Sequence, residues 1–190
     1  MALPSAHMTQ YIALLRGINV GKAKRVAMLE LRALMEELGH TAVSTVLNSG
    51  NVVFNAARTN SAEAAAAIEK AIESHFKFPV PVIVITAREL HTAIAENPFP
   101  EAAATPSQYL VAFAAAEAPL VKARELLAQS WTPDALAFGD KTAYLWCAGG
   151  ILASALAQAF TRAAGAAITT RNWATVLKLQ AATTEGKNPA

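Results

Sequence analysis

The sequence predicts an α+β fold made of two ferredoxin-like (split βαβ) halves, and three observations lead to that prediction. Short apolar runs with strand character alternate with amphipathic helical segments along the chain. In residues 10–97 the predicted order is strand, helix, strand, strand, helix, strand, which is the ferredoxin-like order. Residues 107–182 repeat this order without obvious sequence identity to the first half. Residues 1–9 and 183–190 are expected to be flexible termini.

The first half contains four expected strands and two expected helices. A continuous apolar run predicts a buried strand, and apolar residues at i, i+3, i+4 and i+7 predict an amphipathic helix. Gly39 is placed to end that helix, Asn48-Ser49-Gly50 favours a hairpin turn, and Ser61 is expected to cap the second helix. The expected strands are 11–15, 42–47, 51–54 and 80–86, and the expected helices are 27–38 and one that begins near residue 61.

The second half follows a helix expected around 88–97 and a proline-punctuated loop. Pro119 suits the first turn of a helix, and Gly139-Asp140-Lys141 favours a second hairpin turn. The expected strands are 109–114, 136–138, 142–147 and 167–170, with a helix over the apolar face from Leu152 to Phe160 and a last helix containing Trp173.

Three of the predicted strands are apolar on both faces, namely 11–15, 82–85 and 109–114. A lone sheet with helices on one face exposes the other face to water, so its strands alternate. We therefore expect the two halves to pack together as one unit, with 98–106 as a short connection.

Composition excludes several classes of protein. With 54% hydrophobic and 16% charged residues, the chain is far from the composition of a disordered protein. A net charge of +2 argues against a dedicated, strongly basic nucleic-acid binder but leaves a local basic patch open. No run approaches the roughly 18 apolar residues of a membrane helix, so no membrane partner is expected. The oligomeric state stays open.

Two features favour a cytoplasmic location. Residues 1–10 have neither the basic start nor the apolar stretch of a secretory signal. The single cysteine, Cys147, excludes an internal disulfide and a Cys-rich zinc site, which fits a reducing compartment.

The loop over residues 16–25 is the sharpest local feature, because it holds four positive charges and no negative one. It leads from a strand end into a helix start, where backbone N–H groups and the helix dipole favour an anion beside Lys22, Lys24 and Arg25. The glycine spacing differs from that of a P-loop. The alternative is a solvated basic loop with turn glycines.

Two other segments carry candidate ligand-binding residues. Ser49 and Asn51 flank a glycine in the predicted hairpin turn, where small polar residues serve either a ligand or the turn itself. Arg171 precedes the last helix, where a cation opposes the helix dipole, so it predicts a buried carboxylate partner or an anionic ligand. Asn172 is a candidate cap of that helix or a contact in the same cleft, and Trp173 is expected in the core.

The sequence shows no recognisable catalytic triad, metal site or cofactor motif. The four histidines are scattered, and Asp134 and Asp140, the only aspartates, belong to no metal-like cluster. Ser49 lacks the glycine of a nucleophile elbow, and Cys147 follows Trp146 in an apolar strand, where a buried, inert thiol is expected. No catalytic residue, no metal and no cofactor is therefore predicted.

Several of these segments match a known family in order and spacing across roughly residues 10–181. They are YIALLRGINVG at 11–21, LRAL at 31–34, LNSGNVVF at 47–54 and TTRNWATVLKL at 169–179. The chain resembles the bacterial domain-of-unknown-function family 1697. The resemblance implies an α+β fold of two ferredoxin-like halves, and it implies no activity, substrate or cofactor. The family loop often has two glycines after the Asn-Val pair, whereas Lys22 stands at the second position here, which favours side-chain contact over a backbone nest.

We therefore expect a binding protein for a phosphate-bearing ligand, either a nucleotide or a nucleic-acid backbone, held in one cleft. Two alternatives stay open: an enzyme acting on a phosphorylated small molecule, and a self-association module without small-molecule chemistry. The expected ligand-binding residues are Arg16, Gly17, Asn19, Lys22, Lys24, Arg25, Ser49, Asn51, Arg171 and Asn172.

Overall fold

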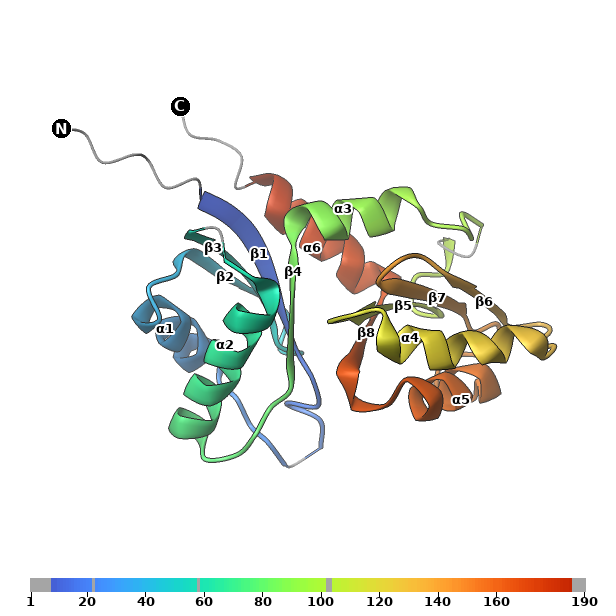
Figure 1. Cartoon of the computed structure of the whole chain (residues 1–190), viewed down its shortest axis with the longest axis horizontal. Coiled ribbons are helices and arrows are strands. Elements are labelled where there is room, and N and C mark those ends of the chain that lie inside the picture. Colours follow the sequence, from blue (N-terminus) through green and yellow to red (C-terminus); the bar gives the residue numbers. More distant parts are fainter. Residues whose placement is uncertain (1–7, 22, 58, 102–103, 186–190) are drawn as a thin grey trace. The chain divides into compact units, whose positions relative to one another are not determined.

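The computed structural model describes residues 8–21, 23–57, 59–101 and 104–185, and Figure 1 shows its elements. In chain order these are β1 (Met8–Leu15), α1 (Met28–Glu37), β2 (Thr41–Val46), β3 (Asn51–Ala57), α2 (Ser61–Phe76), β4 (Val82–Thr86), α3 (Ala87–Ala95), β5 (Tyr109–Ala114), α4 (Ala118–Ala123), the 3₁₀ helix η2 (Arg124–Ala128), β6 (Ala135–Phe138), β7 (Thr142–Trp146), α5 (Ala155–Ala164), the 3₁₀ helix η3 (Gly165–Ala167), β8 (Ile168–Asn172) and α6 (Trp173–Glu185). Of the expected termini, residues 1–7 and 186–190 lie outside the described residues, while β1 begins at Met8 and α6 ends at Glu185.

The chain has a mixed α+β fold with two four-stranded antiparallel sheets, and it divides into two compact units. Unit 1 comprises residues 1–87 and 181–190, and unit 2 comprises residues 88–180. The sequence places the helix around 88–97 at the end of the first half, whereas this division assigns it to unit 2. One tertiary contact of α3 within unit 2 is the hydrogen bond of 2.8 Å that Tyr144 Oη donates to the carbonyl of Ala93.

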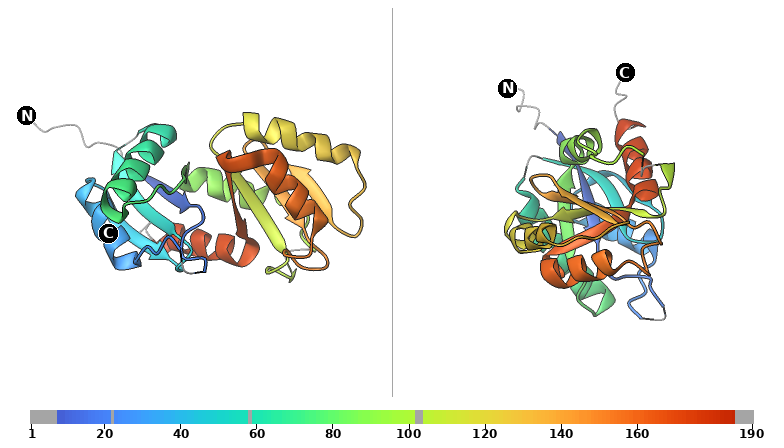
Figure 2. Two further views of the ribbon diagram at one scale, coloured as in Figure 1. Left: turned by 90° about the horizontal axis from the view of Figure 1, so that it is seen from below. Right: turned by 90° about the vertical axis from the view of Figure 1, so that its right-hand side faces the viewer.

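Unit 1 contains a sheet of order β2-β3-β1-β4, in which every neighbouring pair is antiparallel. Both α1 and α2 lie against one face of this sheet, as Figure 1 and the left view of Figure 2 show. Alternate residues of β1, including Tyr11 and Leu15, pack on that face with Leu31 and Met35 of α1 and Ile68 of α2. The predicted hairpin between β2 and β3 is confirmed.

Unit 2 repeats the strand order, with its sheet running β6-β7-β5-β8 and all pairs antiparallel. Figure 1 shows α4 and α5 on one face of this sheet and α3 on the other. On the α3 side, the ring of Tyr109 stacks on that of Trp173 with centroids 5.1 Å apart, which places Trp173 in the core as expected. The second predicted hairpin, β6–β7, is confirmed as well.

Helix ends follow the predicted capping chemistry with one correction. The cap of α2 is Asn60 and not Ser61, because the side-chain oxygen of Asn60 accepts a hydrogen bond of 2.8 Å from the N–H of Ala62. Gly39 ends α1 with φ +85°, as expected. At the start of α6, Asn172 Oδ1 accepts from both N–H and Oγ1 of Thr175 at 2.9 Å, so Asn172 is the cap that the sequence allowed.

Among the described residues, no helix combines the length and the apolar character needed to cross a membrane.

Candidate functional site

The basic loop between β1 and α1 is held in shape by the side chain of Asn19. Asn19 adopts a left-handed backbone conformation with φ +55°, which asparagine tolerates better than most residues. Its Nδ2 donates to the carbonyls of Val26 at 2.9 Å and Asn48 at 2.8 Å, and its Oδ1 accepts from the N–H of Val26 at 3.0 Å. The side chain therefore ties the loop to the start of α1 and to the β2–β3 turn.

The β2–β3 turn approaches the end of β1 so closely that Gly50 is required there. A Cβ at Gly50 would lie 2.7 Å from both Leu15 Cβ and Ile18 Cδ1, and its φ is +79°. The close approach allows the N–H of Leu15 to donate to the Gly50 carbonyl at 2.8 Å. Beside it, the fully buried Asn51 donates from Nδ2 to the carbonyl of Val46 and to Ser49 Oγ. Ser49 and Asn51 thus contact each other within the turn.

These contacts create an open pocket of about 420 Å³ in front of α1. It is lined by Asn19, Arg25, Val26, Ala27, Met28 and Asn48. Ala27 occupies the N-cap position of α1 and has no side chain that can accept from the first N–H groups of the helix. The start of this ten-residue helix, where the dipole is positive, therefore has no side-chain cap, and its residues Ala27 and Met28 line the pocket.

The positively charged residues of the loop differ in their exposure and in their hydrogen-bond partners. Arg25 is exposed, lines the pocket, and has no hydrogen bond or ion pair within the part of the chain that the structure describes. Lys24 donates from Nζ to the carbonyl of Pro79 at 3.0 Å. Arg16 is partly buried, and its backbone N–H donates to the Pro81 carbonyl at 2.9 Å. Lys22 lies outside the described residues.

Glu30 is the acidic residue in the first turn of α1. Its Oε2 lies 3.2 Å from Nε2 of His75 on α2, and both side chains are about half exposed. This contact holds the carboxylate toward α2. Glu30 does not line the pocket.

Arg171 and Asn172 belong to unit 2, whereas the other predicted ligand residues belong to unit 1. Arg171 lies in β8 opposite Val111 of β5, and its Nη1 donates to Thr169 Oγ1 at 2.8 Å and to the Thr170 carbonyl at 2.9 Å. Burial lowers the pKa of its guanidinium to about 10, so Arg171 stays charged at neutral pH. Within unit 2, Arg171 contacts its own strand and Asn172 caps α6.

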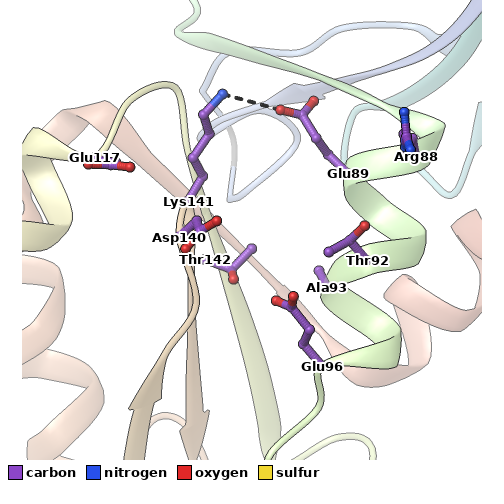
Figure 3. Close-up of a pocket in the computed structure, with 9 residues that line it drawn as sticks. All are labelled: Arg88, Glu89, Thr92, Ala93, Glu96, Glu117, Asp140, Lys141 and Thr142. Atoms are coloured by element: carbon purple, nitrogen blue, oxygen red, sulfur yellow. Dashed lines mark hydrogen bonds and ion pairs between the residues drawn. The ribbon is translucent and has the colours of Figure 1, made fainter.

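A second pocket, of about 270 Å³, lies in unit 2 between α3 and the β6–β7 turn (Figure 3). Its lining combines four carboxylates and two cations with three uncharged residues: Arg88, Glu89, Thr92, Ala93, Glu96, Glu117, Asp140, Lys141 and Thr142. Lys141 Nζ and Glu89 Oε1 form an ion pair of 3.3 Å between the turn and α3, which Figure 3 marks. Tyr144 contacts this pocket through Thr142, and burial raises the pKa of its hydroxyl, with Glu96 as a further, smaller cause.

The residues of this second pocket are not among those predicted from the sequence. They come from three segments that are far apart in the chain, so local spacing gives no signal. In the first pocket, Asn48 and the residues of the first turn of α1 were not predicted either. Asn48 stands next to Ser49 in the turn that was singled out, and that proximity could have identified it.

The other side chains that could take part in a reaction are buried or hydrogen-bonded within the fold. Cys147 is buried, as expected, and burial raises the pKa of its thiol, which disfavours the nucleophilic thiolate. Next to it, Ser154 Oγ donates to Asp134 Oδ2 at 2.7 Å while it accepts from the N–H of Ala157 as the cap of α5. Among the described residues, no group of His, Cys, Asp and Glu is arranged to hold a metal ion.

The fold has a solved counterpart. The chain is similar to the structure of a conserved bacterial protein from Streptococcus pneumoniae, with a TM-score of 0.72 at 21% sequence identity. The similarity covers 92% of this chain and 98% of that one. At this identity the match shows the fold alone.

Sequence comparison gives the family. No curated protein matches the chain. The model of the family described as "Protein of unknown function (DUF1697)" matches residues 8–144, a range that includes the basic loop, the β2–β3 turn and the first pocket. The match confirms the resemblance that the motifs indicated, and the chain belongs to this family.

Proposed function

We propose that this protein binds a phosphate-bearing ligand in the pocket in front of α1. One observation carries the proposal: the start of a ten-residue helix, which has no side-chain cap, lies at a pocket that is also lined by Arg25, an arginine without an ion pair among the described residues. The helix dipole places roughly half a positive charge at that end. A phosphate group can accept hydrogen bonds from the first backbone N–H groups and from the guanidinium together.

The polar groups of the pocket have separate roles. Asn19 uses both protons of Nδ2 and its Oδ1 in hydrogen bonds to Val26 and Asn48, so it shapes the pocket and is not the main donor to a ligand. The side chain of Asn48 is exposed at the opening and adds an amide donor. Arg16 and Lys24 add positive potential around the loop, which favours the approach of an anion.

The residues that line the α1 pocket favour binding of a ligand over its chemical conversion. The described residues that line the pocket include no carboxylate, histidine, cysteine or hydroxyl group, so none of these side chains can act as a general base near neutral pH. An enzyme acting on a phosphorylated small molecule needs such a group. The ligand we propose is therefore a nucleotide or a nucleic-acid backbone that is held and released unchanged.

The test measures the affinity for inorganic phosphate and for adenosine monophosphate at about 50 and 200 mM salt in wild type and in Arg25→Gln. We expect Arg25→Gln to weaken both by about tenfold, since a charge-assisted hydrogen bond contributes roughly 1.5–3 kcal/mol. Wild-type affinity should fall at the higher salt concentration.

Arg32→Gln is the matched control. It removes the same charge within α1, close in sequence to Arg25, but Arg32 pairs with Glu36 at 3.0 Å and does not line the pocket. Its affinity should stay within about twofold of wild type. Equal losses in the two variants, or no phosphate binding by wild type, would exclude the pocket as the binding site.

Two further expectations belong to this proposal. We infer a ferredoxin-like arrangement in each unit, supported by the repeated strand orders β2-β3-β1-β4 and β6-β7-β5-β8 with one helix between the first two strands and one between the last two. We also propose a cytoplasmic location, which the single buried cysteine supports.

A further inference from the structure

We propose that unit 2 holds a ligand site of its own, a third pocket between its sheet and α5 that takes a carboxylic acid with an alkyl chain of medium length. This pocket has a volume of about 370 Å³, which lies within the usual range of small-molecule sites. It shares no lining residue with the pocket in front of α1, so the inference does not rest on the proposed function.

The floor of the pocket is a row of side chains across three neighbouring strands. Leu145 of β7 pairs with Leu110 of β5. Thr170 of β8 pairs with Ala112, which is two residues from Leu110 on β5. Paired residues point to the same face of a sheet, and so do residues two apart in one strand. The three lining residues therefore lie together on the face that α5 covers.

Helix α5 supplies the wall opposite this floor. Ala157 and Phe160 are buried and pack in the core of unit 2, so the fold fixes their positions. Ala157 carries only a methyl group, which leaves room beside it. A ligand that enters between the helix and the sheet meets carbon atoms on both sides.

The turn before α5 forms the outer wall, and its Leu152 lines the pocket although it is 95% exposed. Gln158 Nε2 donates to the carbonyl of Leu152 at 3.4 Å, which ties this turn to α5. A single exposed leucine needs no explanation by itself, but this one borders a pocket with an apolar floor. An alkyl chain in the pocket would cover it. The apolar lining residues are Leu110, Leu145, Ile151, Leu152, Ala157 and Phe160.

Two hydrogen-bond donors of the pocket have no side-chain partner within the described part of the chain, namely the guanidinium of Arg162 and the hydroxyl of Thr170. Thr161, by contrast, uses its proton in a hydrogen bond of 2.8 Å to the carbonyl of Ala157. The described lining residues include no carboxylate, so Arg162 gives the pocket a positive charge. The negative end of the α5 dipole, worth roughly half a charge, reduces this charge but does not cancel it.

These features together select one class of ligand. The alkyl chain of a carboxylic acid covers the leucines, and its carboxylate accepts hydrogen bonds from Arg162 and Thr170. A neutral apolar ligand leaves the guanidinium unpaired, and an amine meets a like charge. Each methylene that becomes fully buried raises affinity roughly fourfold, and partial burial raises it less.

The experiment measures the affinity of the whole protein for octanoate, butyrate and 1-octanol by calorimetry, at concentrations where none of them aggregates. Butyrate keeps the carboxylate but shortens the chain, whereas 1-octanol keeps the chain but lacks the charge. We expect octanoate to bind at least tenfold more tightly than butyrate and at least threefold more tightly than 1-octanol.

Arg162→Gln tests the position of the carboxylate. It should weaken octanoate binding about fivefold and leave the affinity for 1-octanol within about twofold of wild type. Lys122→Gln is the matched control, because Lys122 is also an exposed cation in the last turn of its helix, α4, but does not line the pocket. It should keep wild-type affinity for both compounds.

Leu152→Asn tests the position of the alkyl chain. It should weaken octanoate and 1-octanol alike, by about threefold. Leu127→Asn is its control, since Leu127 is a leucine of unit 2 that is 53% exposed and lies outside the pocket. Because both leucines are exposed, both variants should fold, and circular dichroism checks this.

The outcomes decide between this site and its alternatives. The inference is wrong if octanoate does not bind, if it binds no more tightly than butyrate or 1-octanol, or if the control variants lose as much affinity as the pocket variants. Arg25→Gln should leave octanoate affinity within about twofold of wild type. A loss there would place the acid in the pocket in front of α1, which would overturn this inference while leaving the proposed function intact.

Discussion

The two units carry opposite charge at topologically equivalent edges of their sheets. At the end of β1 the N–H of Leu15 donates to the β2–β3 turn at 2.8 Å, and at the end of β5 the N–H of Ala114 donates to the β6–β7 turn at 3.0 Å. The chain then uses residues 16–27 to reach α1 in unit 1, but only residues 115–117 to reach α4 in unit 2. The long connection is basic, whereas the short one contributes Glu117.

This difference shows that the charge at this edge comes from the connections and not from the sheet. The pocket of unit 2 uses the same edge, yet most of its charged lining residues are carboxylates, and an ion pair joins its two sides. Connections tolerate changes in length and charge that strands do not, because strands must keep their register and their buried side chains. A shared topology therefore carries no shared function.

The largest expected effect on stability comes from disrupting the close contact between the end of β1 and the β2–β3 turn in unit 1. Gly50→Val introduces a Cβ at 2.7 Å from Leu15 and Ile18 in a backbone conformation that favours glycine, so we expect a loss of about 3 kcal/mol in the free energy of unfolding. Urea denaturation measures it. Gly149→Ala is the control, since a Cβ there meets nothing within 4 Å, and a loss as large as that of Gly50→Val would refute the argument from close approach.

The second-largest expected effect on stability comes from releasing the basic loop from the β2–β3 turn. Asn19→Gly keeps the left-handed backbone but removes three hydrogen bonds, to Val26 and Asn48. We expect a loss of roughly 2 kcal/mol in stability together with weaker phosphate binding, because the pocket loses its fixed shape. Unchanged phosphate affinity in a folded Asn19→Gly protein would show that the pocket does not depend on this side chain.

Tyr144→Phe tests a hydrogen bond that holds two elements of unit 2 together. It removes the buried hydrogen bond of 2.8 Å that joins β7 to the carbonyl of Ala93 in α3, at an expected cost of about 1.5 kcal/mol. Phosphate binding should be unaffected, because α3 contributes nothing to the pocket of unit 1. Denaturation and phosphate titration of the same variant check both statements, and a change in phosphate affinity would contradict the separation of the two edges.

The smallest effect concerns the ion pair of unit 2. Glu89→Gln removes the charge that pairs with Lys141, but both side chains are about half exposed. We expect a change of under about 0.5 kcal/mol, diminishing as salt increases. A loss above 1 kcal/mol in denaturation would mean that the pair stabilises α3 far more than its exposure indicates.

The sequence predicts the strands and hairpins well because their signals are local. Apolar runs such as 11–15 and turn residues such as Asn48-Ser49-Gly50 determine backbone conformation over a few residues. The assignment of α3 to unit 2 reflects tertiary contacts, such as the hydrogen bond between Tyr144 and a carbonyl 51 residues earlier, which local sequence patterns do not reveal. Likewise, a cap can shift by one position when two suitable residues are adjacent, as at Asn60 and Ser61.

The candidate site was predictable in part. The basic loop and its position between a strand and a helix follow from the sequence, and Arg25 and Asn19 both line the pocket. The use of the Asn19 amide within the loop could not be foreseen, because it depends on the Val26 and Asn48 backbone arriving within 3 Å. Whether the residues of unit 2, Arg171 and Asn172, join the same cleft stays a prediction.

The division of the chain has a consequence for the order in which the protein is made. Unit 2 is one continuous segment inserted between the two segments of unit 1, and the second of these includes the buried Thr183. During synthesis the ribosome therefore completes every residue of unit 2 before unit 1 has received its last helical turn. The half that carries the basic loop is therefore built from two segments that are separated in the chain by the whole of unit 2, residues 88–180, so its assembly involves a large sequence separation.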